Sequence, residues 1–281
     1  MPHVVIDDGI ATHGGIRVRA RSILPIWRLE RFWEHTWGRR GRFRTPVIDV
    51  RPATVYEDLL REIFALPADW HRAGGCGPLP LRAMALYGQR RSLAHSAETG
   101  VGKSTLLLSH LSQHHTVFTQ DDTGNSDSLS KTQRSPLLKR EAVEFVLGPT
   151  QVTLPRHTFQ DQLQLVLIDG PHGYPFPELE YYFLYPKLDE DGLLILDDIH
   201  IPTIFRLFSF LREERMFDFL GVASTTAFFR RNSTPLFDPE GDGWWKQNYN
   251  TSRFPVRAFD RDFIRPGARL SREMRRILSN L

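Results

Sequence analysis

The stretch Ala97–Thr105 reads AETGVGKST, and the interpretation of the whole chain depends on it. Gly100 and Gly102 lack a Cβ, so the backbone can turn tightly there and approach a ligand closely. The residues before it predict a strand over Ser92–Ala97, and those after it predict a helix over Ser104–His114. A turn from a strand into a helix N-terminus points backbone amides at a ligand. The stretch therefore predicts a ligand-binding loop.

Strand and helix patterns alternate from this loop to about residue 231. Continuous apolar runs predict buried strands at Leu163–Ile168 and Leu193–Leu196. The segment Phe217–Arg231 predicts two strands joined near Ser224. Further strands are predicted at His115–Gln120 and Val143–Leu147, and helices at Ala53–Leu66, Glu178–Leu188 and Ile204–Arg215. Because such alternation requires right-handed crossovers, it predicts an α/β doubly wound domain with a parallel sheet.

Composition narrows the class of protein. The chain has 281 residues, of which 41% are hydrophobic and 25% are charged, as in ordinary globular proteins. The N-terminus lacks a basic start followed by a long apolar core, and no apolar run approaches the roughly 18 residues of a membrane helix. The single Cys76 excludes an internal disulfide and fits a reducing compartment. We therefore expect no signal peptide, no membrane span and a cytoplasmic location.

The N-terminal part is rich in arginine between Arg17 and Arg51, within a chain whose formal net charge is +3. This region fits a nucleic-acid surface or a solvated cap that packs on the core. Base-stacking modules carry more specific signatures, so we favour the cap. The breaker GGCGPLP at Gly74–Pro80 is a candidate boundary. We predict an N-terminal helical extension over residues 1–80, a core over 81–231 and a C-terminal extension over 232–281.

Polar residues follow each of the first five predicted strands of the core. Ligands of a parallel sheet bind beyond the carboxyl ends of its strands, so these residues are expected at one edge. Asp121 and Asp122 follow the second strand about 20 residues after the loop, where a carboxylate can accept hydrogen bonds from both ribose hydroxyls. Thr150 and Gln151 follow the third strand, and their polar side chains could border an adenine. Glu98 ends the first strand, Asp169 the fourth, and Asp197 and Asp198 the fifth.

The loop fits two kinds of nucleotide site. Gly102-Lys103-Ser104 matches the phosphate loop of a nucleoside triphosphatase, and LVLIDG and LLILDD resemble its magnesium-binding strands. The same residues also fit the Glu-x-Gly-x-Gly turn of a Rossmann-like enzyme that binds S-adenosylmethionine. Ala97 stands where the phosphate loop has its first glycine, and a triphosphatase needs no acid after the second strand. We favour the second interpretation and keep the triphosphatase as the alternative.

With these motifs, residues 82–231 resemble the class I S-adenosylmethionine-dependent methyltransferases. The resemblance is strongest to the metal-dependent O-methyltransferases of the catechol and sugar or macrolide types. It is carried by GPTQVTLP at 148–155, LVLIDGPHGY at 165–174 and GLLILDDIH at 192–200. It implies a Rossmann-like, mostly parallel seven-stranded sheet with a C-terminal antiparallel hairpin. It also implies transfer of a methyl group from S-adenosylmethionine to a hydroxyl of a small molecule or sugar, with Mg²⁺ or another divalent cation.

The resemblance also implies roles for individual residues. The methionine part of the cofactor would lie against the loop, the ribose on an acid after the second strand, and the adenine on the segment after the third. Three acids match metal ligands, although the third is usually asparagine in the catechol type, and two histidines fall where a catalytic base is expected. The cofactor residues are Glu98, Gly100, Gly102, Ser104, Asp121 or Asp122 (Asp122 being preferred for the ribose), Thr150 and Gln151; the metal ligands are Asp169, Asp197 and Asp198; the bases are His172 and His200.

Other interpretations of these residues stay open. Asp197 and Asp198 could cap the following helix, because acids are favoured near a helix N-terminus without any metal. His172 and His200 could shape turns or pack. A non-catalytic module whose arginine-rich N-terminus binds an anionic partner is a second alternative for the whole chain. The sequence leaves homo-oligomer formation open.

Overall fold

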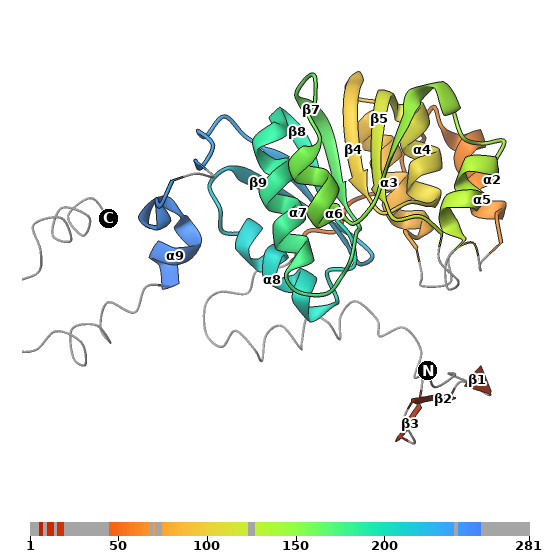
Figure 1. Cartoon of the computed structure of the whole chain (residues 1–281), viewed down its shortest axis with the longest axis horizontal. Coiled ribbons are helices and arrows are strands. Elements are labelled where there is room, and N and C mark those ends of the chain that lie inside the picture. Colours follow the sequence, from red (N-terminus) through yellow and green to blue (C-terminus); the bar gives the residue numbers. More distant parts are fainter. Residues whose placement is uncertain are drawn as a thin grey trace, which may run out of the picture. The chain divides into compact units, whose positions relative to one another are not determined.

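Seven strands form one sheet in the order β6-β5-β4-β7-β8-β10-β9 (Figure 1). The first five are mutually parallel, and β10 runs antiparallel to both β8 and β9. The strands are β4 (Leu93–Thr99), β5 (Ser112–Thr119), β6 (Val143–Leu147), β7 (Leu163–Ile168), β8 (Leu188–Leu196), β9 (Phe217–Ala223) and β10 (Thr226–Arg231). The predicted α/β doubly wound, mostly parallel sheet with a C-terminal antiparallel hairpin is confirmed.

The structure is a computed structural model that describes residues 45–67, 70, 75–122, 127–238 and 241–253, with backbone alone at 6–7, 10–13, 16–19, 245 and 251–253. The chain divides into two units, Met1–Arg44 and Thr45–Leu281. The first contains a three-stranded antiparallel sheet of β1 (Ile6–Asp7), β2 (Ile10–His13) and β3 (Ile16–Arg19). Most of the arginine-rich segment, and the C-terminal extension after residue 253, lie outside the described residues.

Helices cover both faces of the sheet. They are α2 (Glu57–Ala65), α3 (Pro78–Gly88), α4 (Lys103–Leu111), α5 (Ser128–Arg134), α6 (Thr150–Thr153), α7 (Phe176–Leu184) and α8 (Pro202–Leu211), with α9 (Asn248–Arg253) after the last strand. The limit predicted at residue 80 falls within α3, which shares an apolar core with α2 and α4. The predicted three-part division stays a prediction.

The strand β7 shows why the apolar run LQLVLI is buried on both sides. Leu165 and Leu167 point into the core formed with α2, α3 and α4. Val166 and Ile168 point into the opposite core, formed with α7 and α8. Successive strand residues face opposite sides of a sheet, so the part of a strand that lies between two helical layers, here Leu165–Ile168, is apolar on both sides.

Three helices end several residues earlier than predicted. The helix predicted over Ile204–Arg215 ends at Leu211, and in the other two the local context overrides the apolar pattern. The helix predicted over Ser104–His114 ends at Leu111, since Ser112 and His114 already pair with Leu93 and His95 in the sheet. The helix predicted over Glu178–Leu188 ends at Leu184, and a short 3-10 turn leads into β8. Pro186 lacks the amide that would continue an α-helix.

Candidate functional site

The glycine loop lies at the carboxyl end of β4, in the middle of the sheet. Gly100 has φ +96°, and a Cβ on it would lie 2.5 Å from the backbone oxygen of Asp169. Its amide donates to the Phe118 carbonyl oxygen at 2.9 Å. A glycine is therefore required here twice, once for the backbone conformation and once for the close contact with the end of β7. Gly102 precedes the first residue of α4 and donates its amide to Thr105 Oγ1 at 2.9 Å.

Glu98 is fully buried beneath this loop. One carboxylate oxygen accepts the Ser104 hydroxyl at 2.8 Å, and the other accepts the Thr105 hydroxyl. The buried His115 Nε2 lies 3.2 Å from the same carboxylate, while its Nδ1 contacts Ser96 Oγ at 2.7 Å. Glu98 and Ser104 therefore hold the loop to the first turn of α4. Their predicted contact with a cofactor stays a prediction.

Lys103, the central residue of the triphosphatase alternative, is engaged by the protein itself. Its ammonium group donates to the backbone oxygen of Leu66 at 3.1 Å, and burial lowers its pKa. The side chain therefore satisfies the backbone carbonyl of Leu66, the residue that directly follows α2. The structure gives the triphosphatase alternative no support.

The two acids after β5 have different surroundings. Asp122 is half-buried, and its two oxygens accept the backbone amides of Leu129 and Ser130 at 3.1 and 3.0 Å. It thus satisfies amides in the first turn of α5. Asp121 is exposed, and its Oδ1 accepts only the neighbouring amide of Asp122 among the contacts of the described residues. Asp121 has an oxygen left for a ligand, whereas Asp122 serves the helix.

The segment after β6 turns at Gly148, which has φ +132° and donates its amide to the Thr119 oxygen at 2.9 Å. Thr150 begins α6 with its side chain buried, and Gln151 next to it is exposed. The structure therefore places both predicted adenine residues at the carboxyl edge of the sheet. Of the two, Gln151 has the side chain that reaches solvent.

Asp169, His172 and Asp198 converge at the carboxyl ends of β7 and β8. Ile168 pairs with Leu196, so the residues that follow these strands emerge side by side. One ligand atom from each of the three side chains lies within 4.8 Å of the others. His172 Nε2 is 3.6 Å from Asp169 Oδ1 and 3.4 Å from Asp198 Oδ2. We call these three residues the acid–histidine cluster.

The acid–histidine cluster contains more acidic groups than basic ones. Burial, joined by the nearby charges of Asp197 and Asp198, raises the pKa of Asp169 well above its usual range. The carboxylate of Asp169, 3.6 Å from the His172 imidazole, raises the pKa of His172. Both shifts follow from carboxylates gathered in a poorly solvated place. A cation, either a protonated imidazole or a bound ion, would lower the repulsion among them.

The backbone around Asp198 is unusual for a residue with a side chain. Its φ is +53°, in the left-handed region that non-glycine residues seldom adopt. Its carbonyl accepts the Ile201 amide at 2.9 Å, just before α8. His200 Nδ1 lies 3.6 Å from Asp198 Oδ1, with its side chain 45% exposed. The turn thus presents Asp198 and His200 together.

Asp197 stays outside the acid–histidine cluster. It is 4% exposed, and its Oδ1 accepts the Thr226 hydroxyl at 2.5 Å and the Asp198 amide at 2.9 Å. The N-cap of α8 is Ile201 and has no side-chain hydrogen bond, so neither acid caps this helix. The predicted metal ligation by Asp197 stays a prediction.

Three residues near the site were not predicted from the sequence to belong to it. Cys76 is buried, and burial raises the pKa of its thiol well above the ordinary value, with the charges of Asp197 and Asp169 adding to the effect. Thr99 and Glu180 form a buried hydrogen bond of 2.8 Å beside the loop. In the sequence, Cys76 lies within the breaker at Gly74–Pro80, and Thr99 directly precedes Gly100. Neither feature predicts which residues Cys76 or Thr99 contacts in the folded chain.

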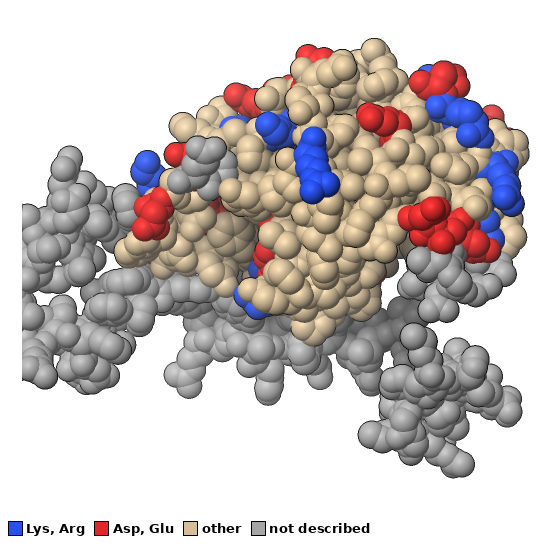
Figure 2. Space-filling model, viewed as in Figure 1, with Lys and Arg blue, Asp and Glu red and all other residues tan. Residues whose placement is uncertain are grey.

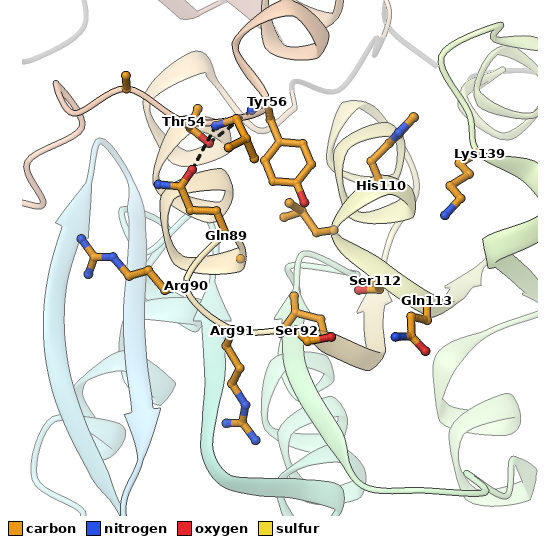
Figure 3. Close-up of a pocket in the computed structure, with 15 residues that line it drawn as sticks. Thr54, Tyr56, Gln89, Arg90, Arg91, Ser92, His110, Ser112, Gln113 and Lys139 are labelled. Atoms are coloured by element: carbon orange, nitrogen blue, oxygen red, sulfur yellow. Dashed lines mark hydrogen bonds between the residues drawn. The ribbon is translucent and has the colours of Figure 1, made fainter.

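A pocket of about 800 Å³ lies at the opposite edge of the sheet, where β4 and β5 begin. Cationic side chains line it, but they are largely engaged elsewhere. Arg91 donates to Asp189 Oδ2 at 2.9 Å, and Arg90 stacks over Tyr87 at 5.6 Å. Figure 3 shows both arginines extending away from the space between Tyr56 and Ser112. The carboxyl edge, where the loop and the acids meet, is therefore the candidate site.

The described surface carries no broad patch of one charge on the face in view. Figure 2 shows basic and acidic side chains in small, interspersed groups on that face. None of the helices in the described part of the chain is long and apolar enough to cross a membrane.

Comparisons with known proteins agree with this fold. Residues 97–199 match the family model described as a methyltransferase domain, whereas no curated protein matches the chain. The fold is similar to a protein assigned as a caffeoyl-CoA O-methyltransferase from Staphylococcus aureus, with 14% identity and a TM-score of 0.51, over 62% of this chain and 91% of that one. It is also similar to a protein assigned as an O-methyltransferase from Klebsiella pneumoniae, with 12% identity and a TM-score of 0.50, over 73% of this chain and 97% of that one.

The match to the methyltransferase family model begins at Ala97, the first residue of the AETGVGKST stretch, and ends just after Asp197 and Asp198. It thus spans the residues that the sheet brings to one edge. At these identities the two solved structures show the fold. The matched residues, the strand order and the glycine loop together identify the core of this chain as a methyltransferase domain with the class I, S-adenosylmethionine-dependent methyltransferase fold.

Proposed function

We propose that this chain transfers a methyl group from S-adenosylmethionine to a hydroxyl oxygen of a small molecule or sugar unit, with the help of a divalent cation. The observation that carries the proposal is the convergence of Asp169, His172 and Asp198 beside Gly100. The likeness in fold to two proteins assigned as O-methyltransferases supports an oxygen acceptor. We expect the enzyme to act in the cytoplasm.

The cofactor would bind along the carboxyl edge from the loop to α6. Gly100 and Gly102 leave the backbone open to close approach, and α4 begins directly after them. Asp121 is the better candidate for the ribose hydroxyls, because the oxygens of Asp122 accept α5 amides. Gln151 is exposed at the start of α6, where it could contact the adenine.

The donor atoms of the acid–histidine cluster fit a divalent cation. Two carboxylates and one imidazole converge within 4.8 Å, and burial, joined by the charges of the neighbouring carboxylates, raises the pKa of Asp169. Asp169, Asp198 and His172 would hold the ion, and Asp197 would support the turn through Thr226. A bound cation would orient the acceptor oxygen and lower the pKa of its hydroxyl.

His200 is the better candidate for the catalytic base. His172 Nε2 lies between two carboxylates, within the proposed ligand set, whereas the His200 side chain is 45% exposed and its Nδ1 lies 3.6 Å from the other oxygen of Asp198, Oδ1. The acceptor hydroxyl would lose its proton to the imidazole as its oxygen forms the new bond to the methyl carbon. The bond from that carbon to the sulfonium sulfur breaks, which leaves a neutral thioether.

The first test is calorimetry of the purified chain with S-adenosylmethionine and, separately, with Mg-ATP. We expect micromolar binding of S-adenosylmethionine and no ATP binding. Transfer of a labelled methyl group to catechols and sugars is then measured with and without a chelator. Asp169→Ala and Asp198→Ala should abolish turnover while keeping cofactor binding.

Asp161→Ala is the matched control, because Asp161 is exposed and pairs with His95 on the surface. Equal turnover in the wild-type protein and both cluster variants would contradict the proposed role of the cation. ATP binding without S-adenosylmethionine binding would refute the proposed reaction.

A further inference from the structure

Glu180 is a buried carboxylate with no part in the chemistry proposed so far. It lies on α7 and is 1% exposed. Its Oε2 accepts the Thr99 hydroxyl at 2.8 Å, and a Cβ on Gly170 would lie 2.2 Å from its Oε1. The carboxylate thus reaches from the helix to the ends of both β4 and β7. A buried charge of this kind is costly, so a specific role would explain it.

Thr99 connects Glu180 to Asp169. The threonine hydroxyl has one proton, which points to Glu180, so its oxygen is free to accept another hydrogen bond. The Asp169 amide donates to that oxygen at 3.1 Å. Thr99 is fully buried, so water cannot replace either partner. The chain of contacts runs from the α7 carboxylate, through one hydroxyl, to the backbone of Asp169.

The backbone of Asp169 is held on several sides by these neighbours. Its amide bonds to Thr99, its carbonyl oxygen lies against Gly100, and the next residue, Gly170, lies against Glu180. A change in the Thr99 hydroxyl would therefore move the point from which the Asp169 side chain projects. Shifts well below 1 Å matter for ligand atoms that must meet around one ion.

We infer that Glu180 is a positioning residue that, through the Thr99 hydroxyl, sets where Asp169 presents its carboxylate to a divalent cation. The inference rests on the proposed function, because it takes Asp169 as a cation ligand. Glu180 itself touches neither the acid–histidine cluster nor a reacting atom in the contacts of the described residues. Residues that orient metal ligands in this way typically change metal affinity about 10- to 100-fold when they are altered.

The test is titration of the full chain with Mn²⁺, with free Mn²⁺ followed by electron paramagnetic resonance. Thr99→Val keeps the shape of the side chain and removes the hydroxyl, and we expect it to weaken Mn²⁺ binding at least about tenfold. Thr99→Ser should restore binding. Thr132→Val is the matched control, because Thr132 is equally buried and its hydroxyl has no partner among the described residues.

Variants at Glu180 complete a double-mutant cycle. Glu180→Gln keeps an oxygen that can accept the Thr99 hydroxyl and should bind Mn²⁺ almost as well as the wild-type protein. Glu180→Leu should weaken binding as Thr99→Val does, and the double variant should lose no more than either alone. Should Thr99→Val fail to fold, the contrast between Glu180→Gln and Glu180→Leu carries the same comparison.

Two results overturn the inference in distinguishable ways. Wild-type protein that binds no Mn²⁺ would contradict the proposed cation site and the inference together. Tight Mn²⁺ binding that stays equal in the wild-type protein, Thr99→Val and Glu180→Leu would refute the inference alone. Thermal unfolding of every variant separates a loss of Mn²⁺ binding from a general loss of stability. The control Thr132→Val should keep the Mn²⁺ affinity of the wild-type protein.

Discussion

Replacing Gly100 with alanine tests whether the loop depends on contact with the end of β7. The residue has φ +96°, and the new Cβ would lie 2.5 Å from the Asp169 backbone oxygen. A strained backbone of this kind costs about 1–3 kcal/mol. An overpacked contact costs about 1–3 kcal/mol more. We therefore expect Gly100→Ala to lower the free energy of unfolding by at least about 2 kcal/mol.

The measurement is urea unfolding of Gly100→Ala beside Gly173→Ala. Gly173 lies in the turn after Asp169, and a Cβ there would meet nothing within 4 Å. That control should stay within about 0.5 kcal/mol of the wild-type protein. Calorimetry with S-adenosylmethionine should also show weaker binding in Gly100→Ala, because the loop must move from Asp169. Equal unfolding free energies for the two variants would refute the argument from the close contact.

Three further predictions follow from single side chains. Burial raises the pKa of Glu180 to about 7 from an ordinary 4.5, with the Thr99 and Thr150 hydroxyls opposing the rise. The folded chain then binds more protons than the unfolded chain between these values, so up to about 3 kcal/mol of stability is lost as pH rises from 5 to 8. Urea unfolding at both pH values should show this loss in the wild-type protein and a smaller one in Glu180→Gln; identical losses would contradict it. Lys103→Ala removes the hydrogen bond to Leu66 and should cost about 1 kcal/mol on denaturation while S-adenosylmethionine affinity in calorimetry stays the same. A large loss of affinity would show that Lys103 contacts the cofactor instead. Cys76 should react with iodoacetamide far more slowly in the folded chain than in urea at pH 8, because burial raises the pKa of its thiol. Equal labelling rates, read by mass spectrometry, would place this thiol at the surface.

The sequence by itself predicted the sheet well, because its strands are strongly patterned. The continuous apolar run at Leu163–Ile168 predicts a strand between two helical layers, and the structure places its residues in both cores. The hairpin predicted near Ser224 is confirmed, with Ser224 itself at φ +56°. Helix ends were predicted less well, because sheet pairing at Ser112 and the proline at 186 decide them.

The candidate site divides in the same way between sequence and fold. Strand ends can be read from the sequence, and residues that follow parallel strands must share an edge, so the meeting of Asp169 with Asp198 was predictable. The direction of each side chain was not. Asp122 turns to the amides of α5, and Asp197 turns inward to Thr226. The spacing of residues along the sequence does not tell which hydrogen-bond donor a carboxylate will meet in the folded chain.

The sequence alone therefore determined the α/β sheet, the glycine loop and the set of acids that could serve it. These depend on local periodicity and on backbone freedom, both of which are properties of short stretches. Only the tertiary structure decided that His172 joins Asp169 and Asp198, and that Thr99 links Asp169 to Glu180, 81 residues away from Thr99. Such contacts form when packed helices bring distant side chains together, and packing is a property of the whole fold.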